Sequence, residues 1–145
     1  MSQNNRALLE ELRAKATKNL ADALGMELTE LTPERVVATM PVDERTRQPF
    51  GLLHGGASVA LAETVASLGG AMNVDLEKFS VVGVEINANH LRGKRDGVVT
   101  GTGTPIHVGR TTQVWEVRIV DEAQRPICVS RSTLAVVPRE RPSQW

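Results

Sequence analysis

One segment, residues 55–73, constrains the fold of this chain more than any other. Small and aliphatic side chains occupy all of its faces at helical spacing, and its nineteen residues make a helix of about 28 Å at 1.5 Å per residue. A helix that is apolar all round is stable only where neighbouring elements bury it. We therefore expect a central helix enclosed by the rest of the domain.

The segments around this helix show the alternating pattern of β-strands. Six strands are predicted, over 25–31, 34–42, 80–92, 97–108, 111–121 and 126–137. Short turns separate the last four, so we expect consecutive strands to be antiparallel neighbours. One helix wrapped by about six antiparallel strands makes an α+β domain. Long strands that end at an open sheet edge also predict that two copies pair through their sheets.

The 145 residues are predicted to form a single domain, because the chain has an ordinary domain length and shows no repeat or linker. An amphipathic surface helix is expected at about 6–24, ending before Gly25, and a frayed tail at about 138–145.

Composition excludes several classes of protein. Seventeen basic and seventeen acidic residues balance, which argues against a nucleic-acid or membrane-surface binder. No apolar run approaches the ~18 residues of a spanning helix, and the first residues lack the apolar stretch of a secretory signal. The single cysteine, Cys128, forms no internal disulfide and alternates with core residues, so we expect a cytoplasmic protein.

Apart from His54 at the entrance of the helix, Glu63 is the only acidic or basic side chain between Gly51 and Val74. Burying a lone carboxylate costs several kcal/mol unless it is paired, hydrogen-bonded or protonated, so Glu63 is a candidate functional group. The alternative is that it makes an otherwise apolar helix more soluble. Ser67, one turn further on, could hydrogen-bond to Glu63 or to a water that it holds.

The residues His54-Gly55-Gly56 precede this helix. Unpaired N–H groups at a helix start, beside glycine, suit the negative oxygen that develops on a carbonyl during acyl transfer. His54 and Gln48 could orient the same carbonyl, or His54 could only cap the helix while the glycines form a turn. No histidine, glutamate or cysteine has the spacing of metal ligands, so no metal is expected.

His54 and Glu63 are nine residues apart, which on a helix means about 13.5 Å and opposite directions. They cannot act on one carbonyl within one chain. Either they are unrelated, or a two-fold axis brings Glu63 of one copy to the helix start of the other. Two basic clusters, Arg92-Lys94-Arg95 and His107–Arg110, are open to two interpretations, phosphate recognition or solvated loops.

Several stretches together resemble a known family. They are Met40–Asp43, Gln48–Ala57, Ala62–Thr64, Val82–Arg92, Pro105–Arg110 and Gln113–Trp115. They look like the hotdog-fold thioesterases of the PaaI/4-hydroxybenzoyl-CoA type over about residues 35–137. Within that family they are most similar to the branch of 1,4-dihydroxy-2-naphthoyl-CoA hydrolase, of menaquinone synthesis, and the enterobactin proofreading thioesterase.

The resemblance implies a hotdog fold, with copies paired as a dimer or a dimer of dimers. It also implies hydrolysis of an acyl-CoA or acyl-carrier thioester without a cofactor. Glu63 would be nucleophile or general base, the Gly55 N–H the oxyanion donor, and Gln48, His54 and Ser67 would assist. The implied substrate- and CoA-binding residues are Val82, Asn89, His90, Leu91, Arg92, Ile106, His107, Val108, Gly109, Arg110 and Thr111. Aromatic residues make up only 3% of the chain, so an aromatic acyl group is implied by the resemblance and not by composition.

Two other functions remain open. A hotdog dehydratase acting on 3-hydroxyacyl thioesters would release no free thiol. A non-catalytic acyl-CoA-binding protein would bind such esters without turnover.

Overall fold

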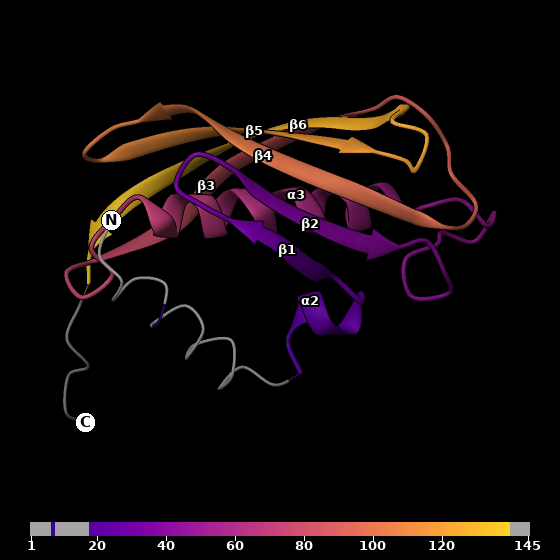
Figure 1. Cartoon of the computed structure of the whole chain (residues 1–145), viewed down its shortest axis with the longest axis horizontal. Coiled ribbons are helices and arrows are strands. Elements are labelled where there is room, and N and C mark those ends of the chain that lie inside the picture. The colour runs from indigo at the N-terminus through magenta and orange to yellow at the C-terminus, as the bar shows by residue number, and fades with distance from the viewer. Residues whose placement is uncertain (1–6, 8–17, 140–145) are drawn as a thin grey trace.

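The computed structural model describes residue 7 and residues 18–139. A six-stranded sheet arches over one long helix, α3 (Gly55–Met72), and a short helix, α2 (Leu20–Ala23), lies beside the sheet (Figure 1). The strands are β1 (Glu27–Leu31), β2 (Val36–Pro41), β3 (Phe79–His90), β4 (Val98–Val108), β5 (Thr112–Val120) and β6 (Pro126–Pro138). The predicted α+β fold, a sheet wrapped on a central helix, is confirmed.

The strand order is β1-β2-β4-β5-β6-β3, and all pairs are antiparallel. The prediction that consecutive strands are neighbours holds for β4, β5 and β6 but is wrong for β3 and β4. Strand β3 pairs with β6 instead, and within the described chain its other edge is open. The connection 91–97 has no helix or strand of its own, and it crosses the end of the sheet rather than making a hairpin.

Helix α3 packs closely because glycines face it. A Cβ on Gly101 would lie 3.2 Å from Leu61 on α3, and a Cβ on Gly103 would overlap Val65. Within the helix, Gly69 leaves room for the ring of the fully buried Trp115. The core therefore depends on small residues where helix and sheet approach each other.

The expectation that α3 is buried on every face is wrong for a single chain. The buried residues form one stripe, made of Ala57, Ser58, Leu61, Ala62, Val65, Ala66, Gly69, Gly70 and Met72. Val59, Ala60 and Ser67 are only half-buried, and Glu63 is exposed. The sheet of one copy covers only one side of the helix, so the apolar residues on the other side have no cover within the described chain.

The two ends differ from their predictions. Lys18 has a left-handed φ of 74°, and Asn19 starts α2 as its N-cap, so no continuous helix runs over 6–24; residues 8–17 lie outside the described part. The turn to β1 uses Gly25 at φ 69°, as predicted. At the other end β6 continues to Pro138, and Arg139 donates hydrogen bonds to the carbonyls of Leu76 and Lys78. The expected frayed tail is therefore wrong for residues 138 and 139, and residues 140–145 lie outside the described part.

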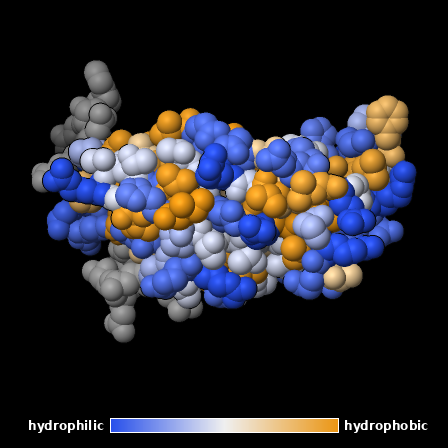
Figure 2. Space-filling model, turned by 90° about the horizontal axis from the view of Figure 1, so that it is seen from above, coloured by the Kyte–Doolittle hydropathy of each residue, from blue (hydrophilic) through white to orange (hydrophobic). Residues whose placement is uncertain are grey.

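The outer surface is mixed in polarity. Figure 2 shows hydrophobic side chains in separate patches among hydrophilic ones on the face seen from above. Among the exposed large apolar residues are Val82 and Val84 on the open strand β3. None of the described helices is long and apolar enough to cross a membrane.

Candidate functional site

Glu63 projects from the uncovered side of α3 toward the open strand β3. A Cβ on Gly83 would lie 2.8 Å from the Glu63 Oε1 atom, so the carboxylate occupies space left free by that glycine. Glu63 and Ser67 line one cavity of about 530 Å³ together with Val59 and Ala60. Ser67 lies one helical turn after Glu63 in this cavity, and no hydrogen bond joins the two side chains in the described chain.

The N-terminus of α3 presents the second group of candidates. His54 is the N-cap, and its Nδ1 accepts a hydrogen bond of 2.8 Å from the Gly56 N–H, so His54 caps the helix, while Gly55 and Gly56 belong to its first turn. The Gly55 N–H donates no hydrogen bond to any part of the described chain, as expected for the first turn of a helix. The His90 ring lies against Gly55, where a Cβ would be 2.9 Å from Nε2.

Gln48 lies in a tight turn before the helix. The Gly51 N–H donates to the Gln48 carbonyl at 2.9 Å, and the Phe50 N–H donates to the Gln48 Oε1. Because Oε1 is engaged, the Nε2 hydrogens are the part of the amide left to donate to another group. Gln48 and Gly55 belong to one cavity of about 380 Å³, whose lining is Gln48, Leu52, Leu53, Gly55, Ser58, His90, Leu91, Arg92, Gly93 and Ile127.

The predicted residues therefore fall into two separate groups within one chain. Group A, at the start of α3, contains Gln48, His54, Gly55, Asn89, His90, Leu91 and Arg92. Group B, beside Glu63 and the β4–β5 turn, contains Glu63, Ser67, Val82, Ile106, His107, Val108, Gly109, Arg110 and Thr111. Glu63 follows Gly55 by eight residues on α3, about 12 Å along the helix, and Gly56 also lines the Glu63 cavity. The β4–β5 turn is farther away, because β4 spans about 33 Å at ~3.3 Å per residue. The prediction that the helix start and Glu63 do not meet in one chain is consistent with this arrangement.

The first basic cluster is only partly available for phosphate. Lys94 forms an ion pair with Glu122 at 2.6 Å, and Arg95 donates to the Phe50 carbonyl at 3.2 Å. The Lys94 ammonium, followed by the Val98 N–H, lowers the pKa of Glu122 to about 2. The structure shows no such interaction for Arg92 in the described chain, so Arg92 is the cation left to face a ligand.

Cys128 and the possible metal ligands add no further site in the part of the chain that the structure describes. Burial raises the pKa of the Cys128 thiol, which lies in the core as predicted. In the described part of the chain, no three His, Cys, Asp or Glu side chains come together as ligands for a metal ion.

Some lining residues were not predicted from the sequence. Ser58 is buried three residues after Gly55, a helical spacing that could have indicated it. Gly83 has no sequence signal of its own, because its importance comes only from the contact with Glu63.

Comparison with known proteins identifies the family. The model of the thioesterase superfamily matches residues 50–128, which include Gly55, Glu63 and most of the sheet. The chain belongs to the thioesterase superfamily. It is a thioester hydrolase with the hotdog fold, as the resemblance implied.

Individual relatives of this thioesterase cover nearly its whole length. The 1,4-dihydroxy-2-naphthoyl-CoA hydrolase of Escherichia coli is 47% identical over 129 residues, which are 89% of this chain and 94% of that protein. The proofreading thioesterase EntH of Cronobacter turicensis is 49% identical over 129 residues, 89% of this chain and 93% of the relative.

Solved structures agree with the fold of this thioesterase. A thioesterase from Pseudomonas aeruginosa, crystallised as a glutamine-to-alanine mutant, has a TM-score of 0.85 and 48% identity, covering 90% of this chain and 94% of that one. A thioesterase of Staphylococcus aureus was crystallised as a glutamine-to-alanine and as a glutamate-to-alanine mutant. The two structures have TM-scores of 0.81 and 0.82 and identities of 42% and 43%, each covering 83% of this chain and 100% of that one.

Proposed function

We propose that this thioesterase hydrolyses an acyl-CoA ester with an aromatic acyl group, at a site completed by a second copy of the chain. The observation that carries the proposal is the division of the site, with donors for a carbonyl oxygen at the start of α3 and a carboxylate beside β3. The name of the Escherichia coli relative, 1,4-dihydroxy-2-naphthoyl-CoA hydrolase, supports the substrate class.

Group A supplies the groups that polarise the thioester. The Gly55 N–H points from the positive end of the α3 dipole, and the Gln48 Nε2 hydrogens lie in the same cavity. Both are donors for the oxygen that becomes negative as the carbonyl carbon turns tetrahedral. His54 contributes by capping the helix, which fixes the direction of its first N–H groups.

Group B supplies the attacking group. Glu63 acts as nucleophile on the thioester carbon or as the base that takes a proton from water, and Ser67 lies one helical turn away in the same cavity. Hydrolysis then breaks the C–S bond and releases free acid and CoA thiol. The spacing of the mutated residues in the Staphylococcus aureus thioesterase supports these roles. Its altered glutamine and glutamate are fifteen residues apart, as Gln48 and Glu63 are.

A second copy joins the two groups. Strand β3 has an open edge, exposes Val82 and Val84, and touches Glu63 through Gly83. We place the two-fold axis along this edge, so that Glu63 of one copy faces the Gln48 cavity of the other. The same pairing would bring Arg92 and the 106–111 turn, from different copies, toward one CoA.

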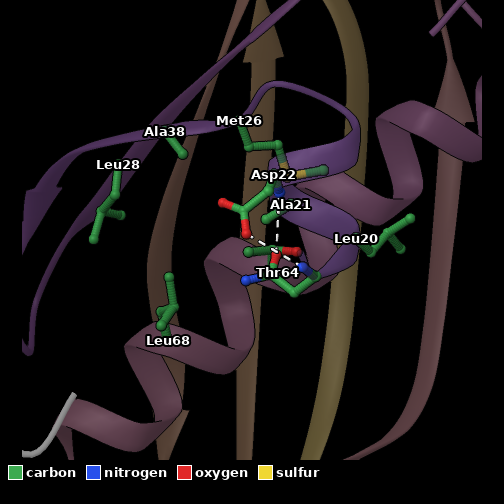
Figure 3. A pocket seen from close by; sticks show the side chains of 9 residues that line it. Leu20, Ala21, Asp22, Met26, Leu28, Ala38, Thr64 and Leu68 are labelled. Carbon is green, nitrogen blue, oxygen red and sulfur yellow. Dashed lines mark hydrogen bonds between the residues drawn. The ribbon is translucent and has the colours of Figure 1, made fainter. Parts of the chain in front are cut away.

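The acyl group fits a cavity of about 610 Å³ next to the Glu63 cavity, since Leu20, Thr64 and Leu68 line both. Figure 3 shows its walls, with Leu28 and Ala38 from the sheet on one side and Leu68 from α3 on the other. The Thr64 hydroxyl donates to the Ala60 carbonyl at 2.7 Å, and the Asp22 carboxylate lies in the lining. Aliphatic walls with one acidic group favour an uncharged acyl group that carries a hydroxyl over one that carries a carboxylate.

The first experiment measures free thiol with DTNB over a panel of benzoyl-, 4-hydroxybenzoyl-, 1,4-dihydroxy-2-naphthoyl-, phenylacetyl- and fatty acyl-CoA. Turnover of the aromatic esters is expected, with a kcat at least ~10²-fold lower for Glu63→Ala and for Glu63→Gln. Unchanged turnover in either variant would overturn the role of Glu63. Dehydration of 3-hydroxyacyl esters without thiol release, or tight binding without turnover, would favour the other two functions.

The second experiment tests the divided site. Mixed dimers of a Glu63→Ala chain and a Gln48→Ala chain would contain one intact site and one doubly altered site, so activity should rise well above that of either parent. Gln48→Ala is preferable to Gly55→Pro, because any Cβ at position 55 would also displace His90. Mixed dimers no more active than the mean of the parents would show that the two residues do not share a site.

A further inference from the structure

Two loops of this protein hold each other through a pair of arginines. The loops are 46–54, which carries Gln48, and 91–97, which follows β3. The Arg47 Nε donates to the Arg95 carbonyl at 2.7 Å, and the Arg95 Nη1 donates to the Phe50 carbonyl at 3.2 Å. A backbone hydrogen bond of 2.7 Å from Leu53 to the Lys94 carbonyl joins the same two loops. Each arginine therefore fixes the backbone of the loop to which the other belongs.

The backbone of Phe50 connects Arg95 to Gln48. Its carbonyl accepts from Arg95, and its N–H donates to the Gln48 Oε1. Gly51 closes the turn with φ 80°, a conformation that favours glycine, and a Cβ there would lie 3.5 Å from the Arg95 Nη1. The direction of the Gln48 amide therefore depends on the position of the Phe50 backbone, and Arg95 holds that backbone at its carbonyl.

We propose that Arg95 is a positioning residue that aims the Gln48 Nε2 hydrogens at the thioester carbonyl. The inference rests on the proposed function, in which Gln48 is one of the two donors to that oxygen. Phe50 is 83% exposed, so burial of its side chain does little to hold the turn. A hydrogen bond from a guanidinium to the Phe50 carbonyl is stronger than one between neutral groups. A displacement of a positioned group by about 1 Å can cost up to about 10²-fold in rate.

This role differs from phosphate binding, the function that the sequence left open for this cluster. A cation that holds a CoA phosphate contributes to KM for CoA esters and contributes nothing for a thioester that lacks the nucleotide. A residue that positions Gln48 contributes to kcat for both substrates, because both have the same reacting carbonyl. The two roles therefore separate when one variant is measured on two thioesters.

The experiment uses the full chain, with 4-hydroxybenzoyl-CoA and the 4-hydroxybenzoyl thioester of N-acetylcysteamine as probes. Arg95→Met should lower kcat about 10-fold on both esters with KM changed less than about 2-fold, and Arg95→Lys, which keeps a charged donor, should recover part of the loss. Arg35→Met removes an exposed arginine that pairs with Glu30 at 2.6 Å, and serves as a control expected to change neither constant. In a Gln48→Ala background, Arg95→Met should lower kcat by less than a further factor of about 2, because the side chain that Arg95 positions is already absent.

Several results would overturn the inference. A KM increase confined to the CoA ester would make Arg95 a phosphate ligand. A kcat loss in the double variant equal to the product of the two single losses would show that Arg95 does not act through Gln48. The side-chain amide signals of Gln48 in a ¹⁵N spectrum, assigned with Gln48→Ala, give a measurement that needs no activity. They should move in Arg95→Lys and stay in place in Arg35→Met, and unmoved signals in Arg95→Lys would refute the inference. If the wild type released thiol from neither ester, the proposed function would fail, while the amide signals would still decide the role of Arg95.

Discussion

The Glu63 carboxylate occupies the space that a side chain on Gly83 would fill, because a Cβ there would lie 2.8 Å from Oε1. Gly83 is on the open strand β3, immediately before an irregularity in its pairing with β6 between Gly83 and Glu85. The position of the carboxylate is therefore set by two elements, the helix that carries it and the strand edge against which it lies.

The first prediction changes this contact. Gly83→Ala should push the end of the Glu63 side chain away while leaving the fold intact, since the displaced atoms belong to an exposed, flexible side chain. We expect kcat for 4-hydroxybenzoyl-CoA to fall about 10-fold or more, because a misplaced base or nucleophile loses its alignment with the carbonyl. Steady-state kinetics with DTNB and a thermal melt measure the two effects.

Gly101→Ala is the matched control for that variant. Its Cβ would lie 3.2 Å from Leu61 in the core, so the expected effect is on the melting temperature and not on the kcat of the folded enzyme. Equal kcat losses in both variants would mean that Gly83 acts on overall packing and not on Glu63.

How far the sequence predicts the fold can be followed on α3. Its small, uncharged residues predicted a central helix, and this prediction is confirmed. The sequence pattern of an apolar helix face does not distinguish a face covered by the sheet of the same chain from one covered by another copy. Val59 and Ala60 were therefore expected to be buried and are half-buried in one chain. The place of β3 could not be predicted either, because a seven-residue connection allows β3 to lie beside β4 or at the far edge.

The site shows a similar limit. Glu63 could be found because a lone charge interrupts an apolar helix, and Gly55 because glycines precede a helix start. The contacts that organise them, Gly83 against Glu63 and Arg95 on the Phe50 carbonyl, join segments 20 and 45 residues apart. Local patterns contain no signal for such pairs, since each residue there is ordinary for its own strand or loop.

A second prediction concerns the cavity in Figure 3. Leu68 lines both this cavity and that of Glu63, so Leu68→Phe narrows the passage between them. We expect kcat/KM for 1,4-dihydroxy-2-naphthoyl-CoA to fall at least 10-fold relative to kcat/KM for acetyl-CoA, because the acetyl group is too short to need the cavity. A change of this size is expected because added volume in a pocket changes the discrimination between substrates by about 1–3 kcal/mol. A ratio equal to that of the wild type would place the acyl group elsewhere.

A third prediction follows from the Lys94–Glu122 pair. The pKa of Glu122 is lowered from 4.5 to about 2 in the folded protein, first by Lys94 and then by the Val98 N–H. A carboxyl with a lower pKa in the folded state stabilises the fold above pH 4.5, and this contribution declines as the pH falls from 4.5 toward 2. Glu122→Gln should therefore lower Tm at pH 7. The decrease should be a few degrees at most, because the Glu122 side chain is 54% exposed, and the difference in Tm from wild type should be smaller at pH 3.

The control for the pH experiment is Glu44→Gln, which removes another exposed carboxylate and should follow the wild type at both pH values. A Tm difference for Glu122→Gln that stays constant from pH 7 to pH 3 would show that it does not come from the ionised carboxylate.

The last prediction sets two opposing effects against each other at Gly69. Replacing a helical glycine by alanine usually stabilises a protein by about 1 kcal/mol through helix propensity. Here the new Cβ would overlap the ring of Trp115, which cannot move easily because its Nε1 donates to Gln113 at 3.1 Å and Gln113 donates to the Gly70 carbonyl at 3.2 Å. Overpacking a core costs about 1–3 kcal/mol, which exceeds or equals the gain from helix propensity. Gly69→Ala should therefore lower the free energy of unfolding, by up to about 2 kcal/mol in urea at fixed protein concentration. Ala71→Gly, on the half-buried side of the same turn, measures the propensity effect together with the loss of one methyl that packs against Met72 and Leu76. A Gly69→Ala variant more stable than wild type would show that the Trp115 ring has room to yield.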